Sequence, residues 1–210
     1  MTALSRCFVA CLLLVIGVAG AEAPAVDWQG KWIAGHGKAL PLLRKTFAVQ
    51  DRKIARATAF VCGLGHFELY LNGQKCGDHF LDPGWTNYRK SCLYVPFDVT
   101  TLLAPGRNAL GVMLGNGMYN VTGGRYTKFT GSFGEPKLIL QLEIQYEDGT
   151  VESVRSDESW RSAPGPITFS CIYGGEDYDA RLEQPGWETA AFDDSAWQPA
   201  LVVDGPGGVL

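Results

Sequence analysis

The sequence predicts an all-β fold, a β-sandwich of the jelly-roll type. Beyond the first 23 residues, almost no segment has apolar residues at helical spacing. Short β-rich runs of alternating polarity recur instead, and turn signals such as Asn-Gly, Pro-Gly and Asp-Gly separate them. This pattern is typical of two packed antiparallel sheets.

The first 23 residues have the layout of a signal peptide. Arg6 is followed by an uncharged run, Cys7–Gly20, and then by small residues that suit cleavage after Ala21 or Ala23. The run is shorter than the roughly 20 residues that span a bilayer, which argues against the alternative of a membrane anchor. We therefore expect an exported protein, periplasmic or extracellular, with no membrane segment after cleavage.

Charge and cysteine content limit the classes of partner and site that we expect. The formal net charge is −4 and the basic residues do not cluster, so nucleic acid is not an expected partner. Cysteine spacing matches no metal or redox motif. In an oxidising compartment Cys62 and Cys76 could bridge neighbouring strands; the alternative is that they, Cys92 and Cys171 are buried thiols.

The first half of the chain predicts a strand followed by a hairpin. Residues 57–62 are rich in β formers, and HFELYL (66–71) alternates apolar and polar side chains as a half-buried strand does. Asn72-Gly73 then predicts a type I′ turn, because both central positions of that turn need positive φ. A return strand is expected over 74–81.

The middle of the chain predicts shorter elements. Residues 93–97 suggest a strand, and Asp98 is placed to cap one helical turn over 99–103. The apolar run 109–114 predicts a strand covered on both sides. Residues 115–135, rich in glycine and tyrosine, predict a long irregular loop.

The domain boundaries follow from these elements. Further strands are expected at 137–146, 151–156 and 167–173. Residues 24–45 are then an N-terminal strand or linker region, and 46–203 the sandwich module. GPGGVL closes the sequence, and we expect 204–210 to begin a linker to a following domain.

The loop LDPGWTNY (81–88) combines turn residues with aromatics. Pro83-Gly84 predicts a type II turn with positive φ at Gly84. Trp85 and Tyr88 are expected to leave the core and to meet either a sugar or another domain. Trp160 and Trp197, by contrast, are expected to fill the ends of the sandwich.

Catalytic and metal-binding patterns are weak. The histidines do not accompany a nucleophile motif, and His66 is interpreted as a hydrogen-bonding surface residue. The acidic loops GGEDYDAR (174–181) and FDDSAW (192–197) leave three alternatives: acid–base chemistry, calcium bound by oxygens, or carboxylates that cap turns and pair with Arg181. Spacing alone does not place two carboxylates across a bond, so the capping interpretation is favoured.

Several ordered motifs resemble one family. GLGHFELYLNGQKCGDHFLDPGWTNY, FDVTTLLAPGRNALGVMLGNGMYN, SDESWRSAPGPITFSCIYGGEDYDARLEQPGW and FDDSAW are similar to the N-terminal β-sandwich module of bacterial α-L-rhamnosidases. ELYLNG, FDVT and DDSAW also resemble, more weakly, the galactose-binding-like jelly rolls of β-galactosidase-type enzymes. The resemblance implies an exported inverting glycoside hydrolase whose catalytic α/α-barrel is absent from this sequence.

The resemblance also implies a function for the module. It suggests contact with a rhamnose-containing glycan and packing against later domains of the same enzyme, with no cofactor required and calcium as an alternative. The residues that it places at a sugar site are Trp85, Asn87, Tyr88, Asn116, Tyr119, Glu176, Asp179 and Arg181. Met118 departs from the tryptophan common in the GNG-x-Y motif and counts against a stacking site there. The alternative is a structural docking domain without a ligand, and the chain alone is expected to be inactive as a hydrolase.

Overall fold

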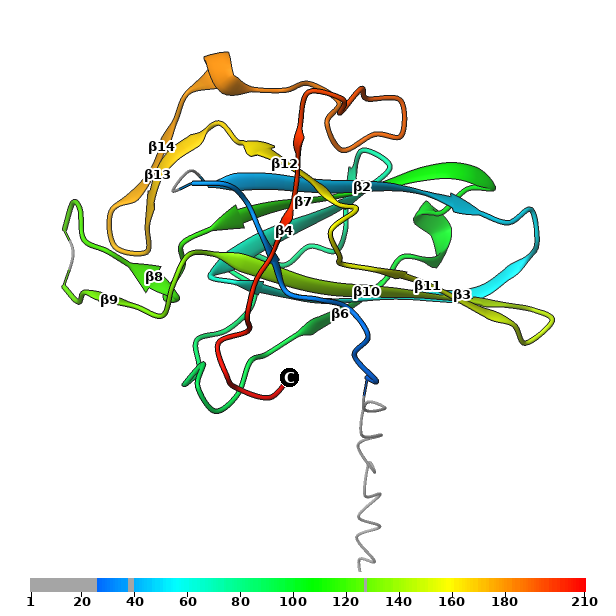
Figure 1. Cartoon of the computed structure of the whole chain (residues 1–210), viewed down its shortest axis with the longest axis horizontal. Helices are drawn as coiled ribbons and strands as arrows, with labels where there is room; N and C mark the ends of the chain where they lie inside the picture. Colours follow the sequence, from blue (N-terminus) through cyan, green and yellow to red (C-terminus); the bar gives the residue numbers. More distant parts are fainter. Residues whose placement is uncertain (1–25, 38–39, 127) are drawn as a thin grey trace, which may run out of the picture.

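The computed structural model describes residues 26–37, 40–126 and 128–210 and forms a β-sandwich of two antiparallel six-stranded sheets (Figure 1). The first sheet contains, in spatial order, β16 (Leu201–Val202), β1 (Ile33–Ala34), β10 (Lys137–Tyr146), β3 (Ile54–Leu64) and β6 (Val95–Asp98), with β11 (Val151–Arg155) also paired to β10. The second sheet contains β15 (Gln198–Pro199), β12 (Arg161–Pro164), β2 (Pro41–Val49), β7 (Gly106–Gly115), β4 (His66–Leu71) and β5 (Gln74–Lys75). The all-β sandwich prediction is confirmed.

Smaller elements complete the fold. Two short hairpins pair β8 (Asn120–Val121) with β9 (Gly131–Ser132) and β13 (Ile167–Cys171) with β14 (Gly175–Tyr178). Two 3₁₀ turns are present, η1 (Thr100–Leu102) and η2 (Ala180–Leu182). The N-cap of η1 is Val99, without a side-chain cap, and not Asp98 as predicted; Asp98 precedes it, and its Oδ1 accepts hydrogen bonds from the Thr100 amide at 3.0 Å and hydroxyl at 2.6 Å.

The main core lies between the two sheets and follows from strand alternation. Phe67, Leu69 and Leu71 of β4 are buried in it, whereas the intervening side chains of β4 point away. Leu138 and Leu140 of β10 enter the same core from the opposite sheet. Trp160 is fully buried there, so its predicted burial is confirmed, whereas Trp197 packs with Trp187 and Leu42 in a separate cluster and not between the sheets.

Backbone angles confirm one predicted turn and correct another. Asn72 (φ 51°) and Gly73 (φ 84°) both have the positive φ that the type I′ hairpin requires. In the LDPGWTNY loop the positive φ falls on Leu81 (φ 61°) and not on Gly84, so the type II turn prediction is wrong. The return strand ends at Lys75, well before residue 81, because a turn at Gly77 (φ 70°) takes the chain out of the sheet.

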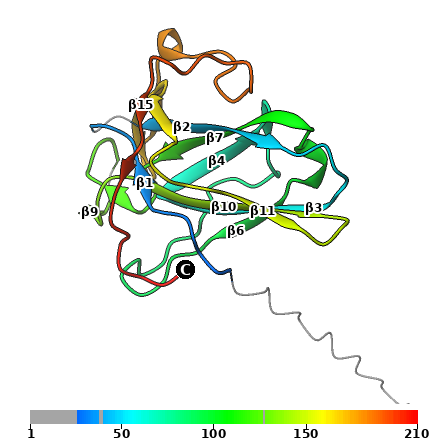
Figure 2. The same ribbon diagram turned by 45° about the vertical axis from the view of Figure 1, so that its right-hand side comes forward.

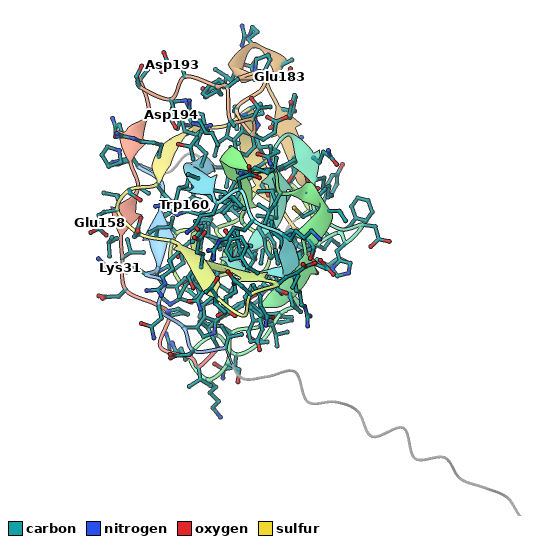
Figure 3. The ribbon with its side chains drawn as sticks, turned by 90° about the vertical axis from the view of Figure 1, so that its right-hand side faces the viewer. Lys31, Glu158, Trp160, Glu183, Asp193 and Asp194 are labelled. Atoms are coloured by element: carbon teal, nitrogen blue, oxygen red, sulfur yellow. The ribbon has the colours of Figure 1, made fainter. Side chains whose placement is uncertain are left out.

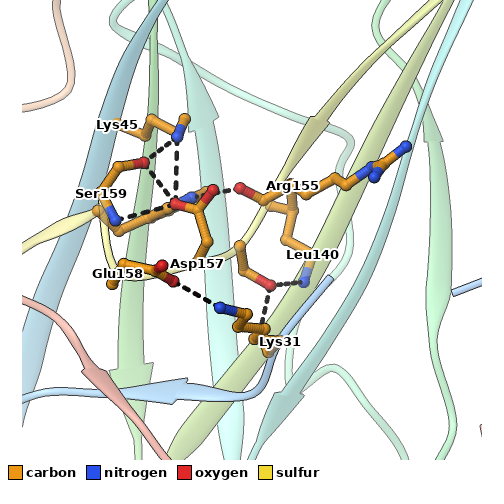
Figure 4. A network of polar contacts seen from close by, with 9 residues as sticks. Lys31, Lys45, Leu140, Arg155, Asp157, Glu158 and Ser159 are labelled. Atoms are coloured by element: carbon orange, nitrogen blue, oxygen red, sulfur yellow. Dashed lines mark hydrogen bonds and ion pairs between the residues drawn. The ribbon is translucent and has the colours of Figure 1, made fainter. Parts of the chain in front are cut away.

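A polar network fixes the connection from β11 to β12, where the chain crosses between sheets (Figure 4). Ser156 Oγ accepts the Leu140 amide at 3.0 Å and donates to the Lys31 carbonyl at 2.6 Å. Asp157 accepts the Ser159 amide at 2.9 Å and pairs with Lys45 at 3.2 Å. These bonds therefore connect the turn to the N-terminal segment at Lys31, to β10 at Leu140 and to β2 at Lys45.

The two terminal segments of the described chain both belong to the sandwich: the N-terminal strands β1 and β2 lie inside the sheets, and the C-terminal strands β15 and β16 lie at their edges. β1 and the first part of β2 lie within residues 24–45 and contribute one strand to each sheet. Figure 2 shows the C-terminal segment descending from β15 past β1, so that it spans both sheets. Beyond β16, Val209 forms a parallel bridge with Ser91.

Three of the cysteines are free, buried thiols: Cys62, Cys76 and Cys92. No disulfide therefore joins Cys62 to Cys76, and Cys171 is also buried. Burial raises the pKa of the Cys76 thiol to about 12. The predicted signal peptide, residues 1–23, lies outside the described residues, and within the described part no helix is long and apolar enough to cross a membrane.

Candidate functional site

A cavity of about 680 Å³ opens on the outer face of the second sheet, the face turned away from the main core. Outward side chains of β4 and β7 line it, together with the β13–β14 hairpin and the segment at Phe80 and Leu81. The hairpin lies on this side of the sheet in Figure 1. A volume of this size is within the range of ordinary ligand sites.

Small side chains on β7 explain why the sheet is hollow here. A Cβ added to Gly115 would meet nothing nearer than Ser170 Oγ at 3.6 Å, so this glycine has room for a small side chain at ordinary van der Waals distances. Further along β7, a Cβ on Gly111 would lie only 2.8 Å from Trp187 Cζ3. Tryptophans thus cover one part of this face and leave the other part accessible.

The rim of the cavity is apolar and exposed. Phe80, Leu81 and Tyr178 line it with exposed fractions of 79%, 66% and 57%. Met113 lies on the floor and is half-buried. Exposed aromatic rings of this kind suit a ligand that has an apolar face.

Glu68 supplies a fixed negative charge to the floor. Its Oε1 accepts from Lys75 Nζ at 2.6 Å and its Oε2 accepts from the Tyr70 hydroxyl at 2.6 Å. Burial opposes the charge, but these two bonds outweigh it and lower the pKa of Glu68. The Lys75 ammonium in turn lies 4.5 Å from the centre of the Phe80 ring.

Glu176 provides a second carboxyl on the β13–β14 hairpin. Burial of this group and the negative charge of Glu68 raise its pKa, while a hydrogen bond with Ser170 opposes the rise. His66 lines the same cavity, and burial lowers its pKa although Asp82 partly compensates. His66 is thus a half-buried cavity residue, which refines its interpretation as a surface residue.

This arrangement combines hydrogen-bond acceptors, a neutral imidazole and apolar walls, which are the groups that hold a polyol. Both oxygens of Glu68 are already engaged, so it is poorly placed for acid–base chemistry. Among the described residues, no group of three or more His, Cys, Asp or Glu side chains is arranged to hold a metal ion.

Some predicted site residues lie at or behind this cavity. Glu176 lines it directly. Asn116 lies behind it, where its Nδ2 donates to the Ser170 carbonyl at 2.9 Å and its Oδ1 accepts from Asn120 at 3.1 Å. Asp179 and Arg181 follow the hairpin and pair with each other, with Arg181 Nε 2.8 Å from Asp179 Oδ1.

The predicted aromatic residues divide into two environments. Trp85 is 62% exposed, as expected, and its ring centroid lies 6.4 Å from that of Phe129. Tyr88 and Tyr119 are buried, so the prediction that Tyr88 leaves the core is wrong. Their rings pack edge to face 5.0 Å apart, in a small cluster against the outer face of the first sheet.

Asn87 also has a structural role that the sequence did not indicate. It is exposed, its carbonyl accepts from Lys90 at 2.7 Å and Ser91 at 3.0 Å, and its Oδ1 accepts the Arg89 amide at 3.3 Å. This turn follows Trp85 directly. Asn87 and Tyr88 therefore anchor the loop, while the side chain of Trp85 remains exposed to solvent.

The remaining acidic residues confirm the capping interpretation. Asp179 Oδ1 caps η2 through the Arg181 amide at 3.1 Å, and Asp193 accepts the Ser195 amide at 3.0 Å. Asp177 pairs with Arg125 at 2.6 Å. Asp193 and Asp194 lie together near the top of Figure 3, in the segment that folds over the second sheet.

Sequence reasoning missed Glu68 and Phe80 as site residues. Glu68 is marked only by its outward place in the alternating strand 66–71, a signal shared by most exposed strand residues. Phe80 is predicted to lie in the return strand, but that strand ends at Lys75. Both reach the cavity through chain pairing that a single sequence does not specify.

Comparison with known proteins identifies relatives of this chain. Residues 52–210 match the family described as "Alpha-L-rhamnosidase N-terminal domain". An α-L-rhamnosidase of Formosa agariphila is 42% identical over 151 residues, which are 70% of this chain and 16% of that protein.

Two solved structures are also similar. The α-L-rhamnosidase from Dictyoglumus thermophilum gives a TM-score of 0.77 at 40% identity, over 87% of this chain and 22% of that one. The Streptomyces avermitilis α-L-rhamnosidase complexed with L-rhamnose gives 0.74 at 39% identity, over 81% and 16%. The chain thus spans about a fifth of the length of these relatives.

Proposed function

Because the chain belongs to the α-L-rhamnosidase N-terminal domain family, we propose that it is the N-terminal accessory module of an exported α-L-rhamnosidase and that it contacts rhamnose-containing glycan. Hydrolysis of terminal α-L-rhamnosides is proposed for the longer protein, with its acid and base in a part that this chain does not include. The three relatives described above are considerably longer than this chain.

The cavity on the second sheet is the observation that supports glycan contact. It places the exposed rings of Phe80 and Tyr178 beside the Glu176 carboxyl. Sugars present apolar C–H faces to aromatic rings, and their hydroxyl groups bond carboxyl oxygens. Its volume of about 680 Å³ accommodates more than one sugar unit.

Calorimetric titration of the chain with a rhamnose-terminated oligosaccharide tests this proposal. We expect saturable binding heat from the wild-type chain. In Glu176→Ala the affinity should fall about tenfold, which is about 1.4 kcal/mol of binding free energy. Glu147→Ala makes the same change in the turn between β10 and β11, away from the cavity, and should leave the heat unchanged. Absence of saturable heat from the folded protein contradicts glycan contact. Repeating the titration with calcium and then with a chelator tests calcium use.

Domain docking is the second candidate, and the exposure of Trp85 supports it. The C-terminal segment passes beside the Trp85 loop, with the Gly208 amide donating to the Tyr88 carbonyl at 3.0 Å and the Val209 amide to the Lys90 carbonyl at 3.1 Å. A domain that follows this segment, as in the relatives, would start next to Trp85 and Phe129. In the longer enzyme, docking predicts that Trp85 becomes protected from oxidation, whereas equal reactivity in both forms contradicts it.

A further inference from the structure

The charges around the cavity restrict the sugars that fit it, an inference that rests on the glycan contact proposed above. Two carboxyl groups line the cavity, Glu68 on its floor and Glu176 on the β13–β14 hairpin. Among the described residues that line it, none is lysine or arginine. A ligand therefore enters a space whose described lining includes two acids and no lysine or arginine.

The nearest cations are already engaged. Lys75 donates to Glu68 at 2.6 Å and lies over the Phe80 ring, so it would have to leave both in order to meet a ligand carboxylate. Beside the hairpin, Arg125 pairs with Asp177 at 2.6 Å, and Arg181 pairs with Asp179 at 2.6 Å. Each positive charge close to the cavity thus has its own carboxylate.

His66 does not supply the missing charge. Burial lowers its pKa, so the imidazole is neutral at pH 7 and offers one donor and one acceptor. The negative charge of Glu68 already disfavours ionisation of Glu176, because it contributes to the raised pKa of Glu176. Lys75 already neutralises Glu68, so a ligand carboxylate would meet the negative charge of Glu176 without a free cation in the described lining to pair with it.

We propose that this cavity selects neutral sugars and excludes uronic acids, chiefly through the negative charge of Glu176. A neutral hexose loses only the water bound to its hydroxyl groups on entry, and hydrogen bonds within the cavity replace that water. A uronate must also desolvate its carboxylate next to two acids, and specificity built on such repulsion is common in recognition sites. The module would then direct the enzyme to neutral side chains of a glycan.

A matched pair of disaccharides tests this selectivity. One has terminal L-rhamnose on a neutral hexose, and the other carries the corresponding uronic acid, so they differ by a hydroxymethyl and a carboxylate group. By calorimetry at low salt and pH 7, we expect the neutral disaccharide to bind at least about tenfold more tightly. Higher salt should narrow the difference, because ions screen the repulsion.

Two variants identify the source of the selectivity. Glu176→Gln keeps the shape of the side chain and removes its charge, so the ratio of uronate affinity to neutral-sugar affinity should rise severalfold over that of the wild type, whatever the loss in neutral binding. Glu147→Gln removes one charge far from the cavity and should change neither affinity. Equal affinity of the wild-type chain for both disaccharides, or tighter uronate binding, overturns the selectivity and leaves glycan contact standing. Absence of binding by both overturns glycan contact and the selectivity together.

Discussion

Arg44 and Asp194 form an ion pair across 150 positions of sequence, and the Arg44 side chain is completely buried. Arg44 points outward from β2, where its Nε and Nη2 also donate to the carbonyls of Trp187 and Thr189, both at 2.8 Å. The pair therefore fastens the segment that carries Trp187 and Trp197 onto the second sheet. This segment covers the part of the outer face that adjoins the cavity.

Loss of Asp194 should destabilise the fold. Asp194→Ala leaves the buried guanidinium without its countercharge, which typically costs about 3 kcal/mol. The double variant Arg44→Met with Asp194→Ala removes the charge as well and should be less destabilised than the sum of the two single variants. Urea denaturation measures all four proteins, and additive effects would contradict this description of the pair.

Trp85 and Tyr88 are three residues apart but should respond differently to truncation. Tyr88→Ala empties a buried site between Tyr119 and Phe133 and should cost about 3 kcal/mol or more. Trp85→Ala removes an exposed ring and should change the free energy of unfolding by no more than about 0.5 kcal/mol. Similar losses in urea denaturation of the two variants would contradict their assigned environments.

The turn after β11 should make the fold sensitive to acid. Burial by itself would raise the pKa of Asp157, but bonds from Ser159 and the charge of Lys45 outweigh it and lower the pKa below its ordinary value (Figure 4). Since the folded pKa lies below the unfolded one, the stabilisation is present above about pH 4 and is lost as the pH falls through the folded pKa.

Asp157→Asn removes this contribution. We expect the variant to be less stable than the wild type at pH 7, with a difference that shrinks as the pH falls below about 4. Urea midpoints measured across this range provide the test, and the exposed Asp51→Asn is the control for losing one negative charge. A difference that stays constant with pH would contradict the assignment.

The fold could be read from the sequence more fully than the site. Alternation in residues 66–71 and 137–146 and the Asn72-Gly73 turn determine strands and hairpin locally, and the structure confirms them. The LDPGWTNY loop could not be resolved in this way, because whether Tyr88 is buried depends on Tyr119 and Phe133, which are distant in sequence. The aromatic composition indicated possible sugar contact, but not which aromatics are accessible.

Predicting the site depends even more than predicting the fold on knowing which strands pair. Glu176 was predicted from its loop, yet Glu68 reaches the same cavity from β4, and the pairing of β4 with β7 places Met113 opposite Glu68 and Gly115 opposite His66. Asp179 and Arg181, by contrast, neutralise each other outside the cavity lining. No local pattern distinguishes these outcomes, because each depends on which strands become neighbours.

The proposed export of the protein gives a separate prediction. In the native host, the mature chain should begin after the signal-peptide cleavage site, at Pro24 if cleavage follows Ala23. Mass spectrometry of the periplasmic and extracellular fractions would find the shortened amino terminus. An intact Met1 form in the cytoplasm alone would contradict export.

The most direct test of the central claim is to fill the cavity and measure glycan binding. A Cβ at Gly115 meets only ordinary contacts, the nearest at 3.6 Å, so Gly115→Val should fold and project its methyl groups into the cavity. We predict that calorimetric titration with a rhamnose-terminated oligosaccharide gives saturable heat for the wild type and at least about tenfold weaker binding for Gly115→Val, with an unchanged unfolding midpoint. Undiminished binding by the folded variant would contradict a sugar site in this cavity.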